Sequence, residues 1–431
     1  MRNFYSVLAN TLVANITTSY LWFALVFWAY LETKSVLATG IIGGVYMLLI
    51  ALCSIWFGTI VDRHKKKRVM LFAAVFTLAA FTLAAGIYAL VPYDIIASLT
   101  QPWFWVFASI LLVGAVVENM RNIAMGTVVT LLVPKDKRAN ANGLAGTVGG
   151  IGFIVTSVFS GLSVGWLGMG WTLVIACVLT AVACVHLYFV DIPEKGIAHD
   201  PELKNKRVDI RGSVAAVRAI PGLLGLLIFS MYNNFIGGSY MALLDPYGLT
   251  MFSVEMWGVV FGIAGTGFVV GGLIIAKFGM GKNPIRTLLL AIIVMGLIGA
   301  VFTIREWPVL FVIGMWLYMV LIPLIEAAEQ TVIQRVVPYQ KLGRVFGFAQ
   351  AMESAAAPLT AFIVAPLAEF WIIPYVQSEA GAQQFEWLLG TGDSRGIALV
   401  FLVSGLVLVI SAVIAFSTKT YRQLSAFYAE S

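Results

Sequence analysis

The sequence predicts an all-α integral membrane protein with twelve transmembrane helices in two pseudo-symmetric six-helix bundles. Its 431 residues are 60% hydrophobic and only 11% charged, whereas soluble domains carry about 25% charged residues. Apolar runs of about 20 residues, the length that crosses a bilayer as a helix, recur along the whole chain. One long polar stretch, 191–219, separates the first six runs from the last six.

Each predicted helix is an apolar run that ends at polar, Gly or Pro residues. The runs lie near 7–31, 37–61, 69–91, 103–133, 143–167, 170–190, 220–244, 253–276, 284–304, 307–334, 344–374 and 396–417. The first run lacks a small-residue cleavage site, so we expect it to be retained as a span. A count of ten or eleven spans stays open if the glycine-rich run 143–167 is re-entrant.

The basic residues are distributed asymmetrically between the predicted loops. Of the 27 Lys and Arg residues, all except Lys34, Arg121, Arg305 and Arg395 fall in the tails or in loops after even-numbered spans. The positive-inside rule therefore predicts cytoplasmic termini and a multi-pass protein of the cell (inner) membrane. Charges that line a membrane face, without a soluble basic module, argue against nucleic-acid binding.

The two halves of the chain are related by an internal repeat. TVVTLLVPKDKRANANGL at 127–144 aligns with TVIQRVVPYQKLGRVFGF at 331–348, and both copies end one even-numbered span and begin the next. The repeat predicts an N-terminal bundle over 1–190, a cytoplasmic linker over 191–219 with a short helix near 209–219, and a C-terminal bundle over 220–431. Duplicated transporters hold substrate near the midplane between their repeats.

A basic loop follows the second predicted span and carries a family signature. The segment Gly58-Thr59-Ile60-Val61-Asp62-Arg63-His64-Lys65-Lys66-Lys67-Arg68 resembles the G-x-x-x-D-R-x-G-R/K-R/K loop of the major facilitator superfamily, except that Lys65 replaces the second Gly. The resemblance covers nearly all of the chain and implies the major facilitator fold and a monomer. It also implies that Gly58, Asp62 and Arg63 form a conformational gate between spans two and eleven. Topology determination alone is sufficient for the remaining bases.

Two further segments are similar to one branch of that superfamily. LLVPKDKRANANGL at 131–144 and GTGDSRGIAL at 390–399 resemble the drug:proton antiporter branch that includes macrolide and Tap-like multidrug exporters. The glycine-rich fifth span lacks the Gly-Pro pair that many exporters carry. The resemblance implies proton-coupled efflux of drugs and antibiotic resistance.

Five charged residues interrupt the apolar spans. They are Glu118, Arg121, Glu326, Glu329 and Glu353. A charge at the bilayer centre costs at least about 2.5 kcal/mol, so such residues normally face a cavity or a partner. At 1.5 Å per residue from Pro134, Arg121 lies about 20 Å inside its span, which is near the middle of the bilayer.

The spacing of these charges suggests their roles. Glu118 and Arg121 lie three residues apart and can pair on one helix face, so a purely structural ion pair is the alternative for them. Glu326 and Glu329 are also three apart, and two neighbouring acids in a low dielectric cannot both ionise easily. We expect these acids to carry protons for coupling. For Glu353 the alternative is a contact with Arg344 or Arg335.

Polar and aromatic residues gather on the first and seventh spans, which line the central cavity by family resemblance. Aromatic rings supply contact area and amides supply adaptable hydrogen bonds, which suits an amphipathic ligand. The alternative for each residue is interhelical hydrogen bonding. The candidates for the substrate cavity are Asn15, Tyr20, Trp22, Tyr232, Asn233, Asn234 and Tyr240.

The leading functional hypothesis is proton-coupled antiport of amphipathic, including cationic, organic compounds across the lipid bilayer. One alternative is export of a specific metabolite, such as a siderophore or a lipid-like product, and another is a non-transporting sensor or scaffold. No catalytic set, nucleotide loop or metal cluster can be assembled, so we expect neither an enzyme nor a bound cofactor or metal. Cys53, Cys177 and Cys184 all fall inside apolar spans and suggest no disulfide framework.

Overall fold

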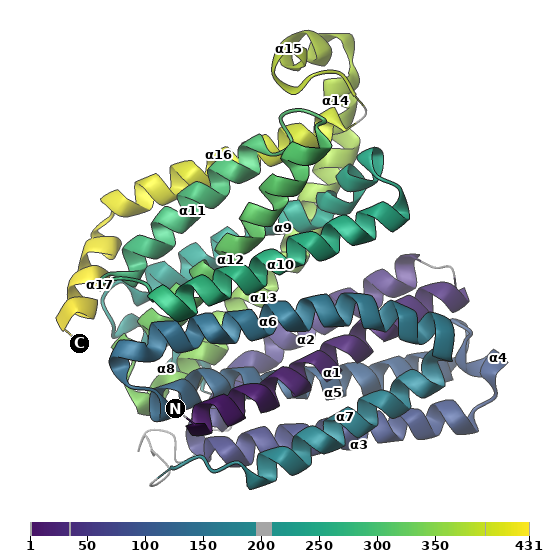
Figure 1. Cartoon of the computed structure of the whole chain (residues 1–431), viewed down its shortest axis with the longest axis vertical. Helices are drawn as coiled ribbons and strands as arrows, with labels where there is room; N and C mark the ends of the chain where they lie inside the picture. Colours follow the sequence, from purple (N-terminus) through teal and green to yellow (C-terminus); the bar gives the residue numbers. More distant parts are fainter. Residues whose placement is uncertain (1, 34–35, 195–208, 393, 431) are drawn as a thin grey trace. The chain divides into compact units, whose positions relative to one another are not determined.

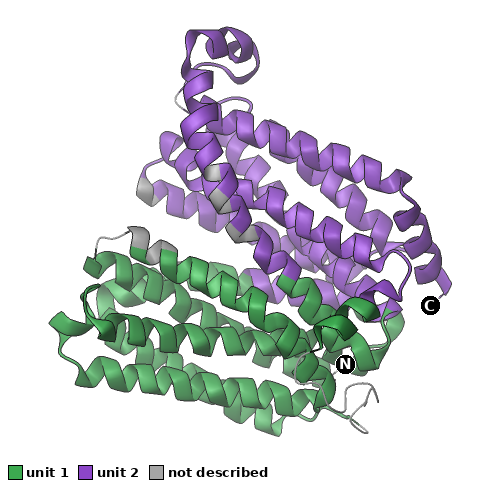
Figure 2. Cartoon of the chain, turned by 180° about the vertical axis from the view of Figure 1, so that it is seen from behind, with its two compact units in different colours: residues 1–138, 151–216, 337–351 green, residues 139–150, 217–336, 352–431 purple. Residues whose placement is uncertain are grey.

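A computed structural model of the chain describes residues 2–33, 36–194, 209–392 and 394–430. The described residues form helices and no strand, which confirms the predicted all-α class (Figure 1). Figure 2 colours two compact units. Unit 1 comprises 1–138, 151–216 and 337–351, and unit 2 comprises 139–150, 217–336 and 352–431.

Unit 1 is built from long helices around an aromatic core. Its main helices are α1 (Arg2–Thr33), α2 (Val36–Arg63), α3 (Lys66–Leu90), α5 (Pro102–Leu132), α6 (Arg138–Leu162) in part, and α7 (Gly168–Phe189), with the shorter α4 (Tyr93–Ile96) and α8 (Ile210–Arg218). Trp28 lies at the centre, stacked on Phe104 at 5.7 Å and edge-on to Phe107 at 5.3 Å. Gly114 lets α5 approach α3 closely, where Thr77 donates to the Gly114 carbonyl at 2.9 Å.

Unit 2 has a corresponding set of helices and a second aromatic core. Its helices are α9 (Leu223–Met251), α10 (Val254–Phe278), α11 (Pro284–Val301), α12 (Pro308–Val336), α13 (Leu342–Leu367) in part, α14 (Ile373–Gln377), α15 (Glu379–Leu389), α16 (Arg395–Ser417) and α17 (Lys419–Glu430). Phe302 stacks on Phe311 and on Phe401, and Tyr240 also stacks on Phe401. These rings join α9, α11, α12 and α16.

Two helices are divided between the units. Residues 139–150 of α6 belong to unit 2, and residues 342–351 of α13 belong to unit 1. Both segments begin inside the repeated motif of the sequence, 127–144 and 331–348, and extend past its end. The predicted boundaries of the two bundles and the linker stay predictions, and most of the linker (195–208) lies outside the described residues. The described end of the linker contains the short helix α8.

Large apolar side chains cover the outside of the helices. Leu52 on α2 is 66% exposed and Ile414 on α16 is 60% exposed, an inverted pattern that fits a lipid environment. Within the described residues, nine helices are long and apolar enough to cross a membrane, or ten if the bent pair α8 and α9 is one span. One of the nine runs over Lys135–Phe189 and takes in two predicted spans. The protein is therefore a multi-pass membrane protein, and the count of twelve stays a prediction.

Candidate substrate and proton site

Unit 2 contains a cavity of about 510 Å³ that lies between α9, α11, α12 and α13. Its wall is mostly apolar and includes four methionines, three aromatic rings and several aliphatic side chains. Methionine is flexible and polarisable, so such a wall can adapt to ligands of different shape. The polar groups of the lining are Ser230, the amides of Asn233 and Asn234, two tyrosine hydroxyls and the three acids Glu326, Glu329 and Glu353.

The three acids come from two helices. Glu326 and Glu329 lie one turn apart on α12, and Glu353 lies on α13 beyond the part that belongs to unit 1. Glu329 is 7% exposed, whereas the side chain of Glu326 is open to the cavity although protein surrounds it. The carboxyl of Glu353 interacts with both acids of α12. Among the described residues, no Lys, Arg or His lines this cavity.

Glu329 is fixed by one hydrogen bond from another helix. The hydroxyl of Ser230 on α9 donates to Oε2 of Glu329 at 2.6 Å, and Ser230 is itself buried. The other oxygen, Oε1, is buried and accepts from no N–H or hydroxyl group among the described residues. The carboxyl of Glu353 lies within hydrogen-bonding reach of Glu329 and can donate while it is protonated. An unsatisfied buried acceptor in a cavity wall is unusual and suggests a place for a ligand or a proton.

The cavity residues predicted from the sequence divide between the two units. Asn233, Asn234 and Tyr240 line the cavity of unit 2, but Tyr232, which is half-buried, is not among its lining residues.

The three candidates on α1 belong to unit 1. Tyr20 is buried and bonded to the Ser163 hydroxyl, which fits the interhelical alternative. Trp22 packs on Tyr46 at 5.4 Å, and Asn15 is half-buried. Their contact with substrate stays a prediction.

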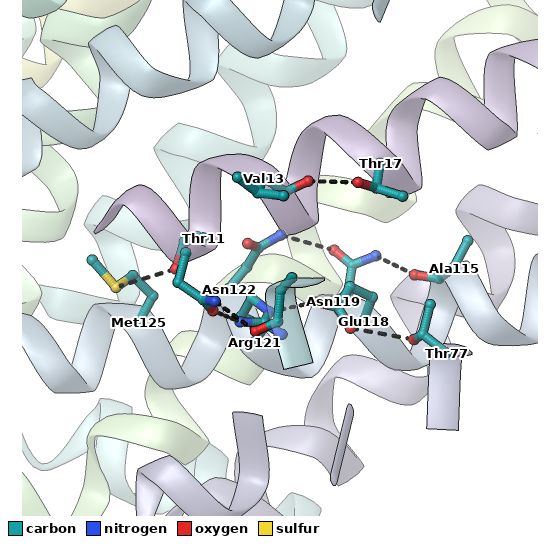
Figure 3. Close-up of polar contacts among 12 residues, drawn as sticks. Thr11, Val13, Thr17, Thr77, Ala115, Glu118, Asn119, Arg121, Asn122 and Met125 are labelled. Carbon is teal, nitrogen blue, oxygen red and sulfur yellow. Dashed lines mark hydrogen bonds and ion pairs between the residues drawn. The ribbon is translucent and has the colours of Figure 1, made fainter. Parts of the chain in front are cut away.

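The charged pair of unit 1 has a counter-charge and hydrogen-bond partners on neighbouring helices, in contrast to the acids of unit 2, although Nη2 of Arg121 is buried and has no hydrogen-bond partner among the described residues. Arg121 pairs through Nε with Glu118, and its other arm donates to Oδ1 of Asn10 on α1 at 2.5 Å. Thr77 of α3 donates to Glu118 at 3.2 Å, and the amide nitrogen of Asn10 donates to the Ala183 carbonyl of α7 at 2.7 Å. Figure 3 shows the residues around this pair. The network thus joins α1, α3, α5 and α7.

The predicted gate residues lie where α2 meets the beginning of α13, inside unit 1. Oδ1 of Asp62 accepts the Gly343 backbone N–H at 2.6 Å, and Oδ2 accepts that of Arg344 at 3.0 Å. A carboxylate at a helix N-terminus satisfies free N–H groups and complements the helix dipole. A Cβ on Gly58 would overlap the Gly343 carbonyl, so glycine is required for this close crossing. Arg63 is half-buried.

Both described ends of the linker contact the segment 339–344. Arg344 is buried and bridges two acids, with Nε 3.3 Å from Asp62 and Nη1 3.1 Å from Asp209, the residue before α8. At the other end of the linker, the Tyr339 hydroxyl donates to Glu194 at 3.2 Å. Burial and the Glu194 carboxylate raise the pKa of Tyr339, which keeps this phenol protonated as a donor.

Three residues of these sites were not predicted from the sequence as site residues. Ser230 was one serine in an apolar run, Asp209 one acid in a polar linker, and Arg344 was considered only as a partner for Glu353. The structure places Arg344 with Asp62 and Asp209, and Glu353 with the acids of the cavity. The repeat gave no signal for them, because Arg344 aligns with Asn140, and Ser230 and Asp209 lie outside the two aligned segments.

Comparison with known proteins identifies relatives over most of the chain. The sequence profile of the Major Facilitator Superfamily matches residues 7–361. Macrolide efflux protein A of Streptococcus pyogenes is 22% identical over 373 residues, which is 85% of this chain and 89% of that protein.

Solved structures with the same fold carry different cargo. An outward-facing bacterial homologue of the iron transporter ferroportin has a TM-score of 0.72 at 14% identity and covers 97% of this chain and all of that one. The proton:xylose symporter XylE has a TM-score of 0.68 at 13% identity and covers 99% of both chains. These two similarities show the fold alone.

Proposed function

Since the chain belongs to the Major Facilitator Superfamily, we propose that it is a proton-coupled antiporter that exports amphipathic organic compounds, cations among them. In this proposal it works by alternating access in the cell membrane, as a monomer, with its termini in the cytoplasm. Similarity to macrolide efflux proteins across most of the chain supports export of antibiotics.

The observation that carries the proposal is the group of three acids in the cavity of unit 2. Glu326, Glu329 and Glu353 interact with one another, and no basic side chain among the described lining residues balances them. Three carboxylates in a low dielectric cannot all stay charged without a counter-charge. They must bind either protons or a cationic ligand. Exchange of protons for a cationic ligand requires a site of this kind.

The cycle follows from this competition. A ligand that enters the open cavity from the cytoplasm displaces protons from the acids, and protons that enter from outside favour release of the ligand. The protein contributes a dry apolar wall that strengthens these charge interactions and one fixed acceptor, Glu329, held by Ser230. Coupling arises because the ligand and the proton cannot occupy the acids together.

In this proposal unit 1 contributes rigidity and a gate. The compensated network around Arg121 holds four helices together. Asp62 holds the beginning of α13, and α13 continues into unit 2, where it carries Glu353. A contact made in only one conformation biases the equilibrium between the two. We assign this bias to Gly58, Asp62 and Arg63 together with Arg344.

Transport in proteoliposomes tests the proposal. With an acidic lumen, wild-type protein should accumulate erythromycin in the lumen and alkalinise it upon addition of the drug. Glu329→Gln should fold normally but lose proton-driven uptake, while Ser239→Ala, a buried serine on α9 outside the cavity lining, should retain it. Uptake that is unchanged in Glu329→Gln, or that needs no proton gradient for any amphipathic compound tested, contradicts the proposal.

A further inference from the structure

The acceptor that Glu329 presents to the cavity has no permanent donor. Its Oε2 accepts from Ser230, and its Oε1 accepts from no N–H or hydroxyl group in the described part of the chain, although the side chain is only 7% exposed. The carboxyl of Glu353, which lies within hydrogen-bonding reach of Glu329, can donate only while it holds a proton. Leaving a buried charged acceptor unsatisfied costs more than an ordinary hydrogen bond contributes. Once the proton shared with Glu353 is lost, Glu329 is therefore suited to a group that brings its own donor.

Most other donors of the cavity are already used. The Ser230 hydroxyl donates to Glu329, the Asn234 amide donates to the Ser230 carbonyl at 3.2 Å, and the Tyr240 hydroxyl donates to the Phe401 carbonyl at 2.9 Å. The carboxyl oxygens of Glu326 and Glu353 add further acceptors. The cavity thus offers more acceptors than donors, and its acceptors carry negative charge.

A cation could instead be held over an aromatic face, as quaternary ammonium groups commonly are. Two of the three rings in the cavity wall are already stacked on other rings, and the third, Tyr318, packs on Tyr240 at 5.1 Å. Tyr240 is stacked on Phe401 with 4.9 Å between ring centroids, and Phe302 is stacked between Phe311 at 5.5 Å and Phe401 at 5.7 Å. The arrangement favours recognition by hydrogen bonds at the acids over an aromatic cage.

We infer that the cavity selects protonated amines that carry at least one N–H, and discriminates against permanently charged quaternary ammonium compounds of the same shape. The inference rests on the proposed function and names its substrate class. A protonated secondary or tertiary amine satisfies the charge of the cluster and donates to Oε1 of Glu329. A quaternary ammonium brings the charge but no donor, and leaves Oε1 unsatisfied.

Binding of matched pairs to the purified full-length protein tests the inference without any transport step. The probes are erythromycin and verapamil, which are tertiary amines, each compared with its N-methylated quaternary derivative. Both amines are protonated at pH 7, so within each pair the charge is equal and only the N–H differs. We expect each amine to bind at least tenfold more tightly than its quaternary partner, since a hydrogen bond to a charged group is worth about one such factor or more.

Variants connect the preference to the named oxygen. Glu329→Leu should bring the affinity ratio of each pair close to one. Glu329→Gln, which keeps a neutral acceptor, should lower the ratio without abolishing it, and gives the test if the leucine variant does not fold. Ser239→Ala should keep the wild-type ratio. Equal binding of amine and quaternary compound, binding of neither, or a ratio that neither Glu329 variant lowers overturns the inference. Proton-driven uptake of other compounds would still support the proposed function in that case.

Discussion

Two groups of buried charges in this protein differ in one respect, the presence of a counter-charge. Glu118 has Arg121 beside it and Thr77 as a donor, whereas Glu329 has only Ser230 and two other acids. Breaking a buried ion pair leaves one charge uncompensated, while neutralising a lone buried acid removes an unfavourable charge. The same kind of substitution should therefore have opposite effects on stability in the two units.

Stability measurements can check this difference. Arg121→Met should lower the free energy of unfolding by about 3–5 kcal/mol, because Glu118 then stays buried without its partner. The double variant Glu118→Leu, Arg121→Met should recover most of that loss, and Glu329→Gln should be neutral or stabilising. Denaturant or thermal unfolding in detergent gives the comparison. A double variant as unstable as Arg121→Met would show that the uncompensated charge of Glu118 is not the cause of the lost stability.

The sequence predicts a contact at these sites only when the two interacting residues are close together in the sequence. The pairing of Glu118 with Arg121 follows from their spacing of three on one helix. The bond between Ser230 and Glu329 joins residues far apart in the sequence, and neither periodicity nor hydropathy indicates which serine of a span faces which acid. The sequence could therefore identify the acids of the cavity but not what fixes them or which oxygen is free.

At the scale of helices, the crossing of α2 and α13 depends on small residues. A Cβ on Gly58 would overlap the Gly343 carbonyl, and one on Gly347 would overlap Ser54. Gly44 lies on the same helix with nothing within 4 Å of such an added atom. Both glycines, Gly44 and Gly58, lie inside α2, so a change to alanine has the same intrinsic effect on helix stability at each position. Comparing the two substitutions therefore separates the effect of the close crossing from this intrinsic effect.

Gly58→Ala should reduce transport at least tenfold, since α13 must move away from α2 to admit the methyl group and its bonds to Asp62 must lengthen. Gly44→Ala should leave transport unchanged and raise helix stability slightly. Initial rates in proteoliposomes at matched protein amounts provide the measurement. Equal rates for both variants would mean that the close crossing is not needed for the cycle.

An ion pair connects the linker helix α8 to the crossing of α2 and α13. Asp209 accepts the Gly212 N–H at 3.0 Å and therefore caps α8, and it also pairs with Arg344. Asp209→Asn keeps an acceptor for the cap but removes the charge, and Asp209→Ala removes both. We expect faster hydrogen exchange of the α8 amides in both variants, with the larger increase in Asp209→Ala because loss of a cap costs about a further 1 kcal/mol. Unchanged exchange in Asp209→Asn would assign the attachment of α8 to the cap alone.

The helices themselves are the part of the structure that the sequence predicts best. Every predicted apolar run lies mostly within one long helix of the structure, because about 20 residues without charge have few other ways to satisfy their backbone in lipid. The division of α6 and α13 between the two units was not predicted. It depends on side-to-side packing, where glycines such as Gly143 and Gly58 decide which helix can come close, and hydropathy carries no information about that.

For the molecule as a whole, the orientation in the membrane rests on the distribution of basic residues. Loops after even-numbered predicted spans are rich in Lys and Arg, while Arg305 is an isolated base in an odd loop. Because short basic loops are retained in the cytoplasm, this asymmetry predicts the side of every loop at once. It also predicts on which side of the membrane the proposed gate at Asp62 lies, so an error in orientation would reverse the proposed direction of transport.

Reporter fusions can determine this orientation. Green fluorescent protein fused after Ser431 or after Lys282 should fluoresce, and alkaline phosphatase at the same sites should be inactive, since both positions are expected in the cytoplasm. Fusions after Arg305, in the next loop, should give the opposite result for each reporter and serve as the internal control. Active phosphatase at Ser431 would place the C-terminus outside. The basic loop at 63–68 would then lie on the outer side, and the proposed direction of transport through the cavity of unit 2 would be reversed.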